Sequence, residues 1–469
     1  MLYHFYSFKF LIFFAVVFGV YWGLPRHRLR MVWLLLASCV FYMSWNPWLI
    51  LLILFTAAFD YAVAIRLETM RSPAHRRLLL ALSIGTSLAL LAFFKYTNFL
   101  LDSARTTLNL FGAGVEPVLV NIVLPLGISF YTFETISYVV DVYLGRVKAV
   151  RDPVDYALYI LFFPHLIAGP IVRPRDFLPQ IRRAKRFNWD RVQLGAQFFL
   201  IGLFKKVVLA DHLATVADPV FAEPSGYATS AVWLAVLAYA GQIYCDFSGY
   251  SDMAVGLAHA LGFRLPVNFR MPYFAASITE FWRRWHISLS SWLRDYLYVP
   301  LGGNRGGRLA TYRNLLATML LGGLWHGASW TFVLWGAYHG VLLALHRLLP
   351  RPRILSALAL RPLGVAATFL AVCVGWVFFR AQSLGDAGTL LSRMFAPAGG
   401  TALDLPTTLI AAGCLAVLLA GHLVGTFVDL KRAERRAPAA VLGAGLAGLL
   451  LAVLFLMPVN AKGFIYFQV

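Results

Sequence analysis

Two stretches that lie close together in the sequence decide the fold: Ile278–Gly307, ITEFWRRWHISLSSWLRDYLYVPLGGNRGG, and Leu315–Gly340, LLATMLLGGLWHGASWTFVLWGAYHG. The first mixes arginines with tryptophans and tyrosines, which is typical of a membrane face that meets an anionic ligand. The second is apolar except for WHGASW at Trp325–Trp330. Together they set His286 and His326 forty residues apart. We expect the rest of the chain to be a scaffold for these two stretches.

The composition places the chain among membrane proteins. Of its 469 residues 60% are hydrophobic and 13% charged, and the mean hydropathy is +0.71. Such a chain is too apolar for a soluble domain and uses lipid as its solvent. The first 25 residues lack a basic region followed by a cleavage site of small residues, so we expect a first spanning helix there. The four cysteines stand singly in apolar runs, which indicates neither a disulfide framework nor a metal site.

The formal charge of +20 is concentrated in alternate loops. Basic clusters follow the first predicted span, the third predicted span and residue 172, and the positive-inside rule assigns all three to the cytoplasm. The amino terminus is then outside. Asp211, Asp218 and Glu223 indicate an outer loop. Membrane insertion and contact with anionic membrane lipids explain this pattern, and nucleic acid is not indicated as a partner.

Apolar segments of about the length that a bilayer needs predict ten simple spans. They are residues 8–24, 31–45, 48–65, 78–94, 119–142, 193–211, 229–258, 362–380, 406–428 and 438–457. Three further apolar segments contain breaks or charges: 154–172, 273–300 and 314–346, the last followed by Arg347, Arg351 and Arg353. Because irregular backbone at membrane depth needs protein or water around it, we interpret these three as re-entrant or broken helices that line a central cleft. One membrane domain, residues 1–469, is the expected organisation.

His326 is the first candidate for chemistry. The unperturbed pKa of a histidine is about 6.5, so a ring at membrane depth is normally neutral and able to accept a proton. That property suits a general base for attack of a hydroxyl on a thioester. The glycines beside it leave room for a substrate and offer N–H donors to an oxyanion. A core histidine bonded to a neighbouring helix remains the alternative.

His286 follows Arg283, Arg284 and Trp285 in the sequence. The positive charges of the two arginines favour the neutral form of its ring. It is suited to orient an acyl donor or to assist His326, and an interfacial histidine is the alternative. The segment 264–313 holds eight arginines, no lysine and two acids. Arginine binds phosphate through two parallel hydrogen bonds, so this segment predicts a phosphate-bearing donor such as a coenzyme A thioester.

Several other polar residues fall inside predicted spans. The run GQIYCDFSGYSDM sets Asp246 and Tyr250 on one helical face, for which we predict a structural network rather than direct chemistry. Glu134 and Asp141 are equally ambiguous, and His165 is predicted to belong to a loop. The sequence holds no G-x-S-x-G, Walker A or H-E-x-x-H motif, which argues against an internal serine nucleophile, ATP hydrolysis and zinc catalysis.

Residues 121–180 and 242–340, with the ending GFIYFQV, resemble the membrane-bound O-acyltransferase (MBOAT) superfamily. The motifs RRWHISLSSWLRDY and GLWHGASW carry the resemblance, which is greatest to its alginate O-acetyltransferase-like branch. It implies an all-α polytopic membrane protein with about eleven transmembrane helices and re-entrant helices around a central tunnel, with core motifs in about 121–346. It also implies that His326 is catalytic, with His286 at the family's second polar position.

The resemblance implies an enzyme that moves acetyl from cytoplasmic acetyl-CoA across the bacterial inner membrane. The acceptor is then a periplasmic acetyltransferase or carrier protein of an exopolysaccharide system of the alginate or cellulose type. The residues expected to bind the donor are Arg283, Arg284, Arg294, Arg305 and Trp285, with no permanently bound cofactor and no metal.

Two alternatives stay open. Related teichoic-acid D-alanylation proteins take their acyl group from a small acidic carrier protein, which a basic cytoplasmic face also suits. The second alternative is a transporter subunit for a polymer or solute that makes no bonds.

Overall fold

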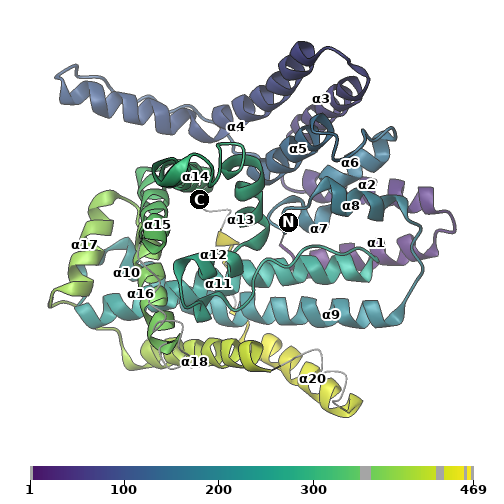
Figure 1. Ribbon diagram of the computed structural model, residues 1–469. Helices are drawn as coiled ribbons and strands as arrows, with labels where there is room; N and C mark the ends of the chain where they lie inside the picture. The colour runs from purple at the N-terminus through teal and green to yellow at the C-terminus, as the bar shows by residue number, and fades with distance from the viewer. Residues whose placement is uncertain (1–3, 349–360, 429–437, 459–461, 466–469) are drawn as a thin grey trace. The chain divides into compact units, whose positions relative to one another are not determined.

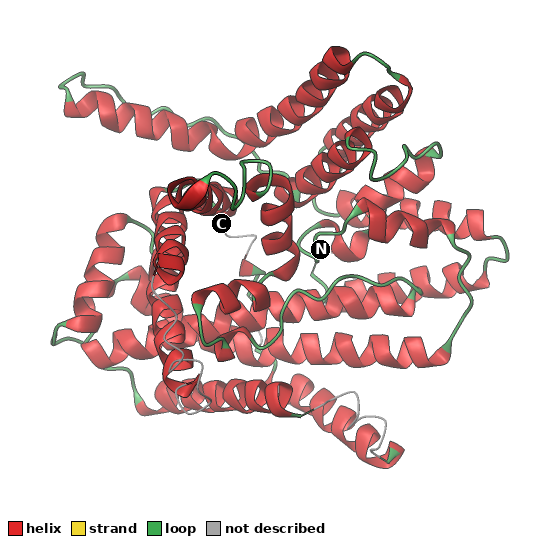
Figure 2. Ribbon diagram, in the orientation of Figure 1, coloured by secondary structure: helices red, strands yellow, loops and turns green. Residues whose placement is uncertain are grey.

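The computed structural model describes residues 4–348, 361–428, 438–458 and 462–465. All the regular structure in these ranges is helical, and loops join the helices (Figures 1 and 2). Among the described residues five helical stretches are long and apolar enough to cross a membrane: Ile50–Thr69, Pro73–Leu110, Trp189–Ala222, Arg361–Arg380 and Leu405–Phe427. The all-α, polytopic fold class is thereby confirmed, whereas the count of eleven spans stays a prediction.

The backbone contacts divide the chain into two compact units. The first consists of residues 1–196 and 254–266, and the second of residues 197–253 and 267–469. The prediction of a single membrane domain is not tested by this division.

The helices of the amino-terminal part are α1 (Phe8–Gly23), α2 (His27–Met43), α3 (Ile50–Thr69), α4 (Pro73–Leu110), α5 (Ile128–Tyr143), α6 (Pro153–Leu161), α7 (Phe163–Leu166), α8 (Pro174–Arg182) and α9 (Trp189–Phe204). The middle of the chain forms η1 (Lys205–Ala210), α10 (Asp211–Ala222), η2 (Pro224–Gly226), α11 (Thr229–Ala260), η3 (Pro272–Phe274), α12 (Ile278–Arg284), α13 (Ile287–Leu293) and η4 (Arg294–Tyr298). The remainder forms α14 (Gly307–His326), α15 (Trp330–Leu348), α16 (Arg361–Arg380), α17 (Leu384–Phe395), α18 (Leu405–Phe427) and α20 (Ala439–Leu456).

Every predicted span overlaps a helix, but several boundaries were wrong, including the one at 211, where the helical stretch continues to Ala222. The span predicted at 78–94 belongs to α4, which continues to Leu110. The polar residues after position 94 lower the hydropathy, but they do not interrupt the helix. The span predicted to begin at 119 begins only at Ile128. Pro125 and Gly127 delay it, since Gly127 has φ +74° and lies against the backbone of Leu166, where a Cβ would be 2.6 Å from the carbonyl oxygen.

The prediction of an outer loop at Asp211 and Asp218 was wrong. Both lie inside α10, and Asp211 is buried. Cations replace the water that a loop would have supplied: Lys206 Nζ lies 2.8 Å from Asp211 Oδ1, and Arg380 Nη2 lies 3.1 Å from Asp218 Oδ1. Glu223 follows the end of this helix. A buried carboxylate tolerates the loss of water when it is paired in this way.

All three segments predicted to be broken are broken. Residues 154–172 form α6 and the single turn α7, followed by buried irregular backbone. Residues 273–300 form short pieces, α12, α13 and η4, on either side of His286. Residues 314–346 belong to α14 and α15, which separate at Gly327–Ser329 inside the WHGASW motif. Arg351 and Arg353 lie outside the described residues.

Glycines bring α14 and α15 together side by side (Figure 1). A Cβ on Gly336 would lie 2.4 Å from the carbonyl oxygen of Met319, and one on Gly323 would lie 2.3 Å from that of Phe332. Because these neighbours are backbone atoms of regular helices, they cannot move aside cheaply. Gly323 was predicted to leave room for a substrate. In the structure the space beside it is occupied by the backbone of α15, so its role is close helix packing.

We expect Gly336→Val to separate α14 from α15 and to lower the yield of folded, monodisperse protein at least several-fold, because the new side chain overlaps the Met319 backbone. Size-exclusion chromatography and thermal unfolding in detergent measure this effect. Gly413→Val in α18 is the control, since nothing lies within 4 Å of a Cβ there. Equal yields of the two variants would contradict the packing role of Gly336.

Candidate active site

The structure brings His286 and His326 close to the same tryptophan ring, that of Trp325. The ring centroids of His286 and Trp325 are 6.2 Å apart, and those of Trp325 and His326 are 4.9 Å apart. His286 is fully buried and His326 is 4% exposed. The two candidate catalytic residues therefore belong to one site in the second unit, although they come from different helices.

Aromatic side chains enclose both imidazoles. Phe247 of α11 lies edge-on to His286, with ring centroids 4.6 Å apart. Trp335 of α15 and Phe379 of α16 contact His326 at centroid distances of 5.0 and 5.2 Å. Rings of this kind exclude water and hold the imidazoles in fixed orientations. A reaction that water would spoil, such as transfer of an activated acyl group, suits such surroundings.

His286 has an unusual backbone. Its φ is +42°, a left-handed conformation that residues other than glycine rarely adopt, and it forms the junction between α12 and α13. The junction is held by neighbouring backbone: the Ile287 N–H donates to the Asn268 carbonyl at 2.9 Å, and the Trp285 N–H donates to that of Phe281 at 2.8 Å. Strain of this kind persists only where the surroundings impose it, and it is concentrated at functional sites.

Asn268 fixes which nitrogen of His286 carries the proton. The Ser288 N–H, which is always a donor, lies 3.2 Å from Asn268 Oδ1, so this atom is the amide oxygen. His286 Nδ1 lies 3.3 Å from the same oxygen and must donate to it. Nδ1 then carries the hydrogen and Nε2 keeps a lone pair. Nε2 is buried and has no hydrogen-bond partner among the described residues.

A third histidine, His339 of α15, belongs to the same cluster, and sequence reasoning missed it. Its ring is fully buried, 4.8 Å from the ring of Trp335, which also contacts His326. Within the described parts of the chain neither of its ring nitrogens has a hydrogen-bond partner. The only indication in the sequence was an ionisable residue in an apolar helix thirteen positions after His326.

The residues predicted to bind the donor differ in their exposure. Trp285 is buried against Phe269 and Trp376, at centroid distances of 5.0 and 4.9 Å. Arg284 is half-buried and bonded to Glu280. The other three are exposed: Arg283 in α12, Arg294 at the start of η4, and Arg305 in the loop before α14.

The predicted structural network around Asp246 is confirmed. Lys206 Nζ lies 2.7 Å from Asp246 Oδ1 and 2.8 Å from Asp211 Oδ1, with all three side chains buried. The Ile465 N–H near the carboxyl terminus donates to Asp246 Oδ2 at 2.6 Å. Removing one member of such a network would leave an uncompensated buried charge.

Two polar residues of the first unit pair in a way the sequence did not reveal. His165 Nδ1 lies 3.2 Å from Glu134 Oε1, and both side chains are buried. The prediction that His165 belongs to a loop was wrong, because His165 lies within the single helical turn α7.

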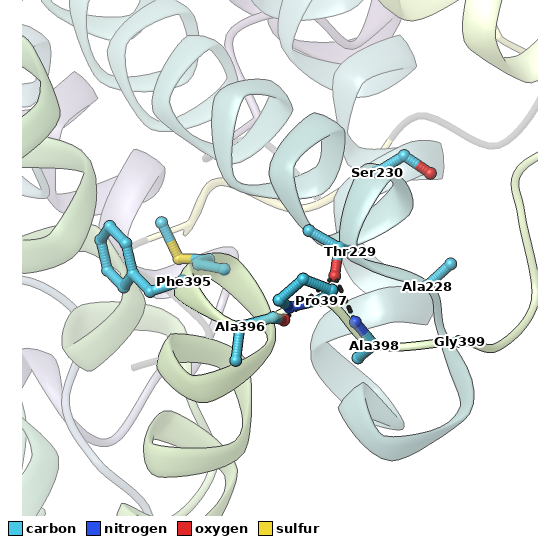
Figure 3. A pocket seen from close by; sticks show the side chains of 9 residues that line it. Ala228, Thr229, Ser230, Phe395, Ala396, Pro397, Ala398 and Gly399 are labelled. Atoms are coloured by element: carbon cyan, nitrogen blue, oxygen red, sulfur yellow. Dashed lines mark hydrogen bonds between the residues drawn. The ribbon is translucent and has the colours of Figure 1, made fainter.

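An open pocket of 570 Å³ lies away from the histidines, between the start of α11 and the segment that follows α17. Figure 3 shows Thr229 in its wall, with Oγ1 accepting a hydrogen bond from the Ala398 N–H at 2.9 Å. The nine residues that line it include no acid, base or cysteine. It offers nothing for acyl-transfer chemistry.

The helical fold and the paired buried histidines define a class of membrane enzyme. The model of the MBOAT, membrane-bound O-acyltransferase family, matches residues 148–383, which include both histidines and the aromatic residues that enclose them. The chain belongs to this family, is a multi-pass membrane protein and is an O-acyltransferase.

Three relatives of this chain have names that refer to different polymers. The chain is 47% identical to the probable alginate O-acetylase AlgI of Azotobacter vinelandii over 88% of its own length and 82% of the relative's. It is 39% identical to the peptidoglycan O-acetyltransferase of Helicobacter pylori, covering 77% of this chain and 73% of the relative. A teichoic acid D-alanyltransferase of Bacillus subtilis is 30% identical over 55% of this chain and 69% of its own length.

Proposed function

We propose that this O-acyltransferase moves acetyl groups from acetyl-CoA in the cytoplasm, across a bacterial inner membrane, to a hydroxyl acceptor that serves the O-acetylation of an alginate-type exopolysaccharide. The observation that carries the proposal is the burial of His286 and His326 around Trp325, in a chain that is 47% identical to a protein named probable alginate O-acetylase.

The chemistry requires one proton acceptor and a dry site. The acceptor hydroxyl loses its proton to the imidazole of His326 while its oxygen bonds to the thioester carbonyl carbon. The C–S bond then breaks, and the imidazolium returns the proton to the departing sulfur. The products are an acetyl ester and the free thiol of coenzyme A. His286 is suited to assist His326, because Asn268 holds the hydrogen on Nδ1 and the lone pair on Nε2 can accept a hydrogen bond from the acceptor hydroxyl.

The lengths of the helices suggest which arginines serve the donor. α13 has seven residues, so at 1.5 Å per residue Arg294 lies roughly 10 Å along the helix from His286. Arg305 precedes the 20-residue helix α14, which ends at His326 roughly 30 Å away. We therefore propose Arg294 and Arg283 as phosphate contacts. Arg305 was also predicted to bind the donor, but it lies at the far end of α14 from His326. Trp285 supports the site by packing.

The length of α14 also supports transfer between compartments. A distance of roughly 30 Å is about the thickness of the hydrocarbon core of a bilayer. Since the basic loop before α14 is expected in the cytoplasm, His326 at its far end is suited to meet an acceptor from the opposite side. That acceptor is a periplasmic acetyltransferase or carrier protein of the exopolysaccharide system.

The alternative donor is an acylated carrier protein. The similarity of the chain to a teichoic acid D-alanyltransferase favours this alternative. The alternative of a transporter without bond-making is set aside because the chain belongs to an enzyme family.

The proposal is tested by measuring ester-linked acetate on the secreted polymer of a producing bacterium whose own copy has been deleted. We expect the wild-type gene to restore acetylation. Purified protein supplied with acetyl-CoA and acceptor should release the free thiol of coenzyme A, which a thiol reagent detects. If the protein were active with an acetylated carrier protein and inactive with acetyl-CoA, the carrier protein would be the donor and this part of the proposal would be wrong.

We expect Asn268→Ala to lower the rate of acetyl transfer about tenfold, because the ring of His286 loses the hydrogen bond that sets its tautomer, and Ser288 loses its partner. The measurement is the initial rate of coenzyme A release by protein that elutes as a single peak. Asn188→Ala, which removes an exposed amide bonded to the Arg191 N–H, is the control. An unchanged rate in Asn268→Ala would show that the tautomer of His286 does not matter.

A further inference from the structure

A cavity of 840 Å³ in the second unit has a strongly apolar wall and a basic edge. Helices α16 and α18 and the turn η3 supply most of the wall, including Tyr273, Phe369 and Leu415. Arg284 and Arg361 stand at its edge. The two-carbon acetyl group that the enzyme transfers needs no cavity of this size, and neither Arg283 nor Arg294, the proposed phosphate contacts of the donor, lines it.

The two arginines share a single carboxylate. Arg284 Nη2 lies 2.5 Å from Glu280 Oε1, and Arg361 Nη2 lies 3.4 Å from the same oxygen. The other oxygen, Oε2, accepts a hydrogen bond from the Ala276 N–H at 2.8 Å, which holds the carboxylate in place. Among the residues that the structure describes, two positive charges and one negative charge leave a net charge of +1 at the edge. The Arg361 side chain is 48% exposed and keeps donors available for a further anion.

This charge and this wall match a particular kind of molecule. A single phosphodiester carries one negative charge, and arginine is the side chain best suited to bind phosphate. Acyl chains fill an apolar cavity favourably, because each buried CH₂ group is removed from water. A zwitterionic headgroup would bring its own cation towards the arginines, which disfavours it.

The sequence indicates the side of the membrane on which the basic edge lies. Arg347, Arg351 and Arg353 precede α16, which begins at Arg361, and the run KRAERR follows α18. The positive-inside rule assigns both ends to the cytoplasm. Anionic lipids are concentrated in that leaflet, and basic pockets between spanning helices on that side bind their headgroups.

We propose that this cavity binds an anionic glycerophospholipid of the inner leaflet, with its phosphate on Arg361 and Arg284 and an acyl chain against α16 and α18. The lipid would also contact the active-site region, because Tyr273 in the cavity wall packs against Trp285, the neighbour of His286, with ring centroids 6.1 Å apart. A lipid in this position would stabilise the junction at which His286 is strained. The inference concerns binding and does not depend on the identity of the acyl donor.

The test is native mass spectrometry of the full chain, released from nanodiscs that contain equal amounts of phosphatidylglycerol and phosphatidylcholine. We expect the wild type to retain phosphatidylglycerol in preference to phosphatidylcholine. Arg361→Gln should lower that retention about tenfold, as expected for loss of a charge-assisted hydrogen bond. Glu280→Gln should raise it, because the net charge of the edge increases from +1 to +2.

Two further variants separate the cavity from general surface charge. Ala366→Trp fills the apolar part and should remove retention of the lipid while leaving both arginines in place. Arg105→Gln removes an arginine that is paired with Asp102 in the first unit, outside the cavity, and should change nothing. Each variant is first shown to elute as a single peak.

Equal retention of the two lipids by the wild type would overturn the proposal. So would phosphatidylglycerol retention that neither Arg361→Gln nor Ala366→Trp reduces. Because retention is measured without acetyl-CoA or acceptor, failure of this inference is distinguishable from failure of the proposed function.

Discussion

His326→Ala is expected to abolish acetyl transfer, with a fall in rate of about a thousandfold or more, while the protein still folds and inserts. The variant removes the proposed general base, whose typical contribution is two to four orders of magnitude. The smaller side chain leaves a space among Trp325, Trp335 and Phe379 but no unpaired charge. The measurement is coenzyme A release by purified protein, together with acetate on the secreted polymer.

His212→Ala provides the matched control for this variant. His212 lies in α10 and its Nδ1 donates to the Val208 carbonyl at 2.8 Å, so the variant removes a histidine outside the aromatic enclosure. We expect its activity to stay within about twofold of the wild type, as for most substitutions away from a site. Normal transfer by His326→Ala would remove His326 from the mechanism.

Substitutions at His286 are expected to have the second largest effect. His286→Gly keeps the left-handed backbone at φ +42° without strain but removes the imidazole, so we expect a folded protein with about a hundredfold less activity. His286→Asn should retain more activity, because asparagine tolerates this conformation and supplies a polar group. Initial rates of both variants, with thermal unfolding in the same detergent, make the comparison.

The glycine variant separates strain from chemistry. If His286 mattered only as a structural junction, relief of the strain would leave the rate unchanged or higher in His286→Gly. That result would contradict a role for the ring. A low rate in a variant at least as stable as the wild type would support it.

Much of the fold was predictable because it depends on patterns that lipid imposes. Runs of apolar residues predicted the helices, and the WHGASW motif predicted where α14 and α15 separate. Hydropathy failed where a helix continues beyond its apolar part, as in α4, and where buried ion pairs replace water, as at Asp211. Neither feature has a sequence pattern of its own.

The site was only partly predictable for a related reason. His286 and His326 stood out as ionisable residues in apolar stretches, but their meeting around Trp325 depends on how α13 and α14 pack. Asn268 and His339 became candidates only through contacts with residues distant in the sequence, His286 for Asn268 and Trp282 for His339. The arginines were visible from composition, but composition does not distinguish Arg284, bonded to Glu280, from the exposed Arg294.

The most direct test of the central claim uses proteoliposomes with radiolabelled acetyl-CoA outside and a hydroxyl acceptor, either alginate oligosaccharide or the periplasmic partner protein, sealed inside. Vesicles whose protein exposes its cytoplasmic face outward should transfer label to the enclosed acceptor and release an equal amount of free coenzyme A, and His326→Ala should do neither. Equal labelling by the wild type and His326→Ala would contradict the account.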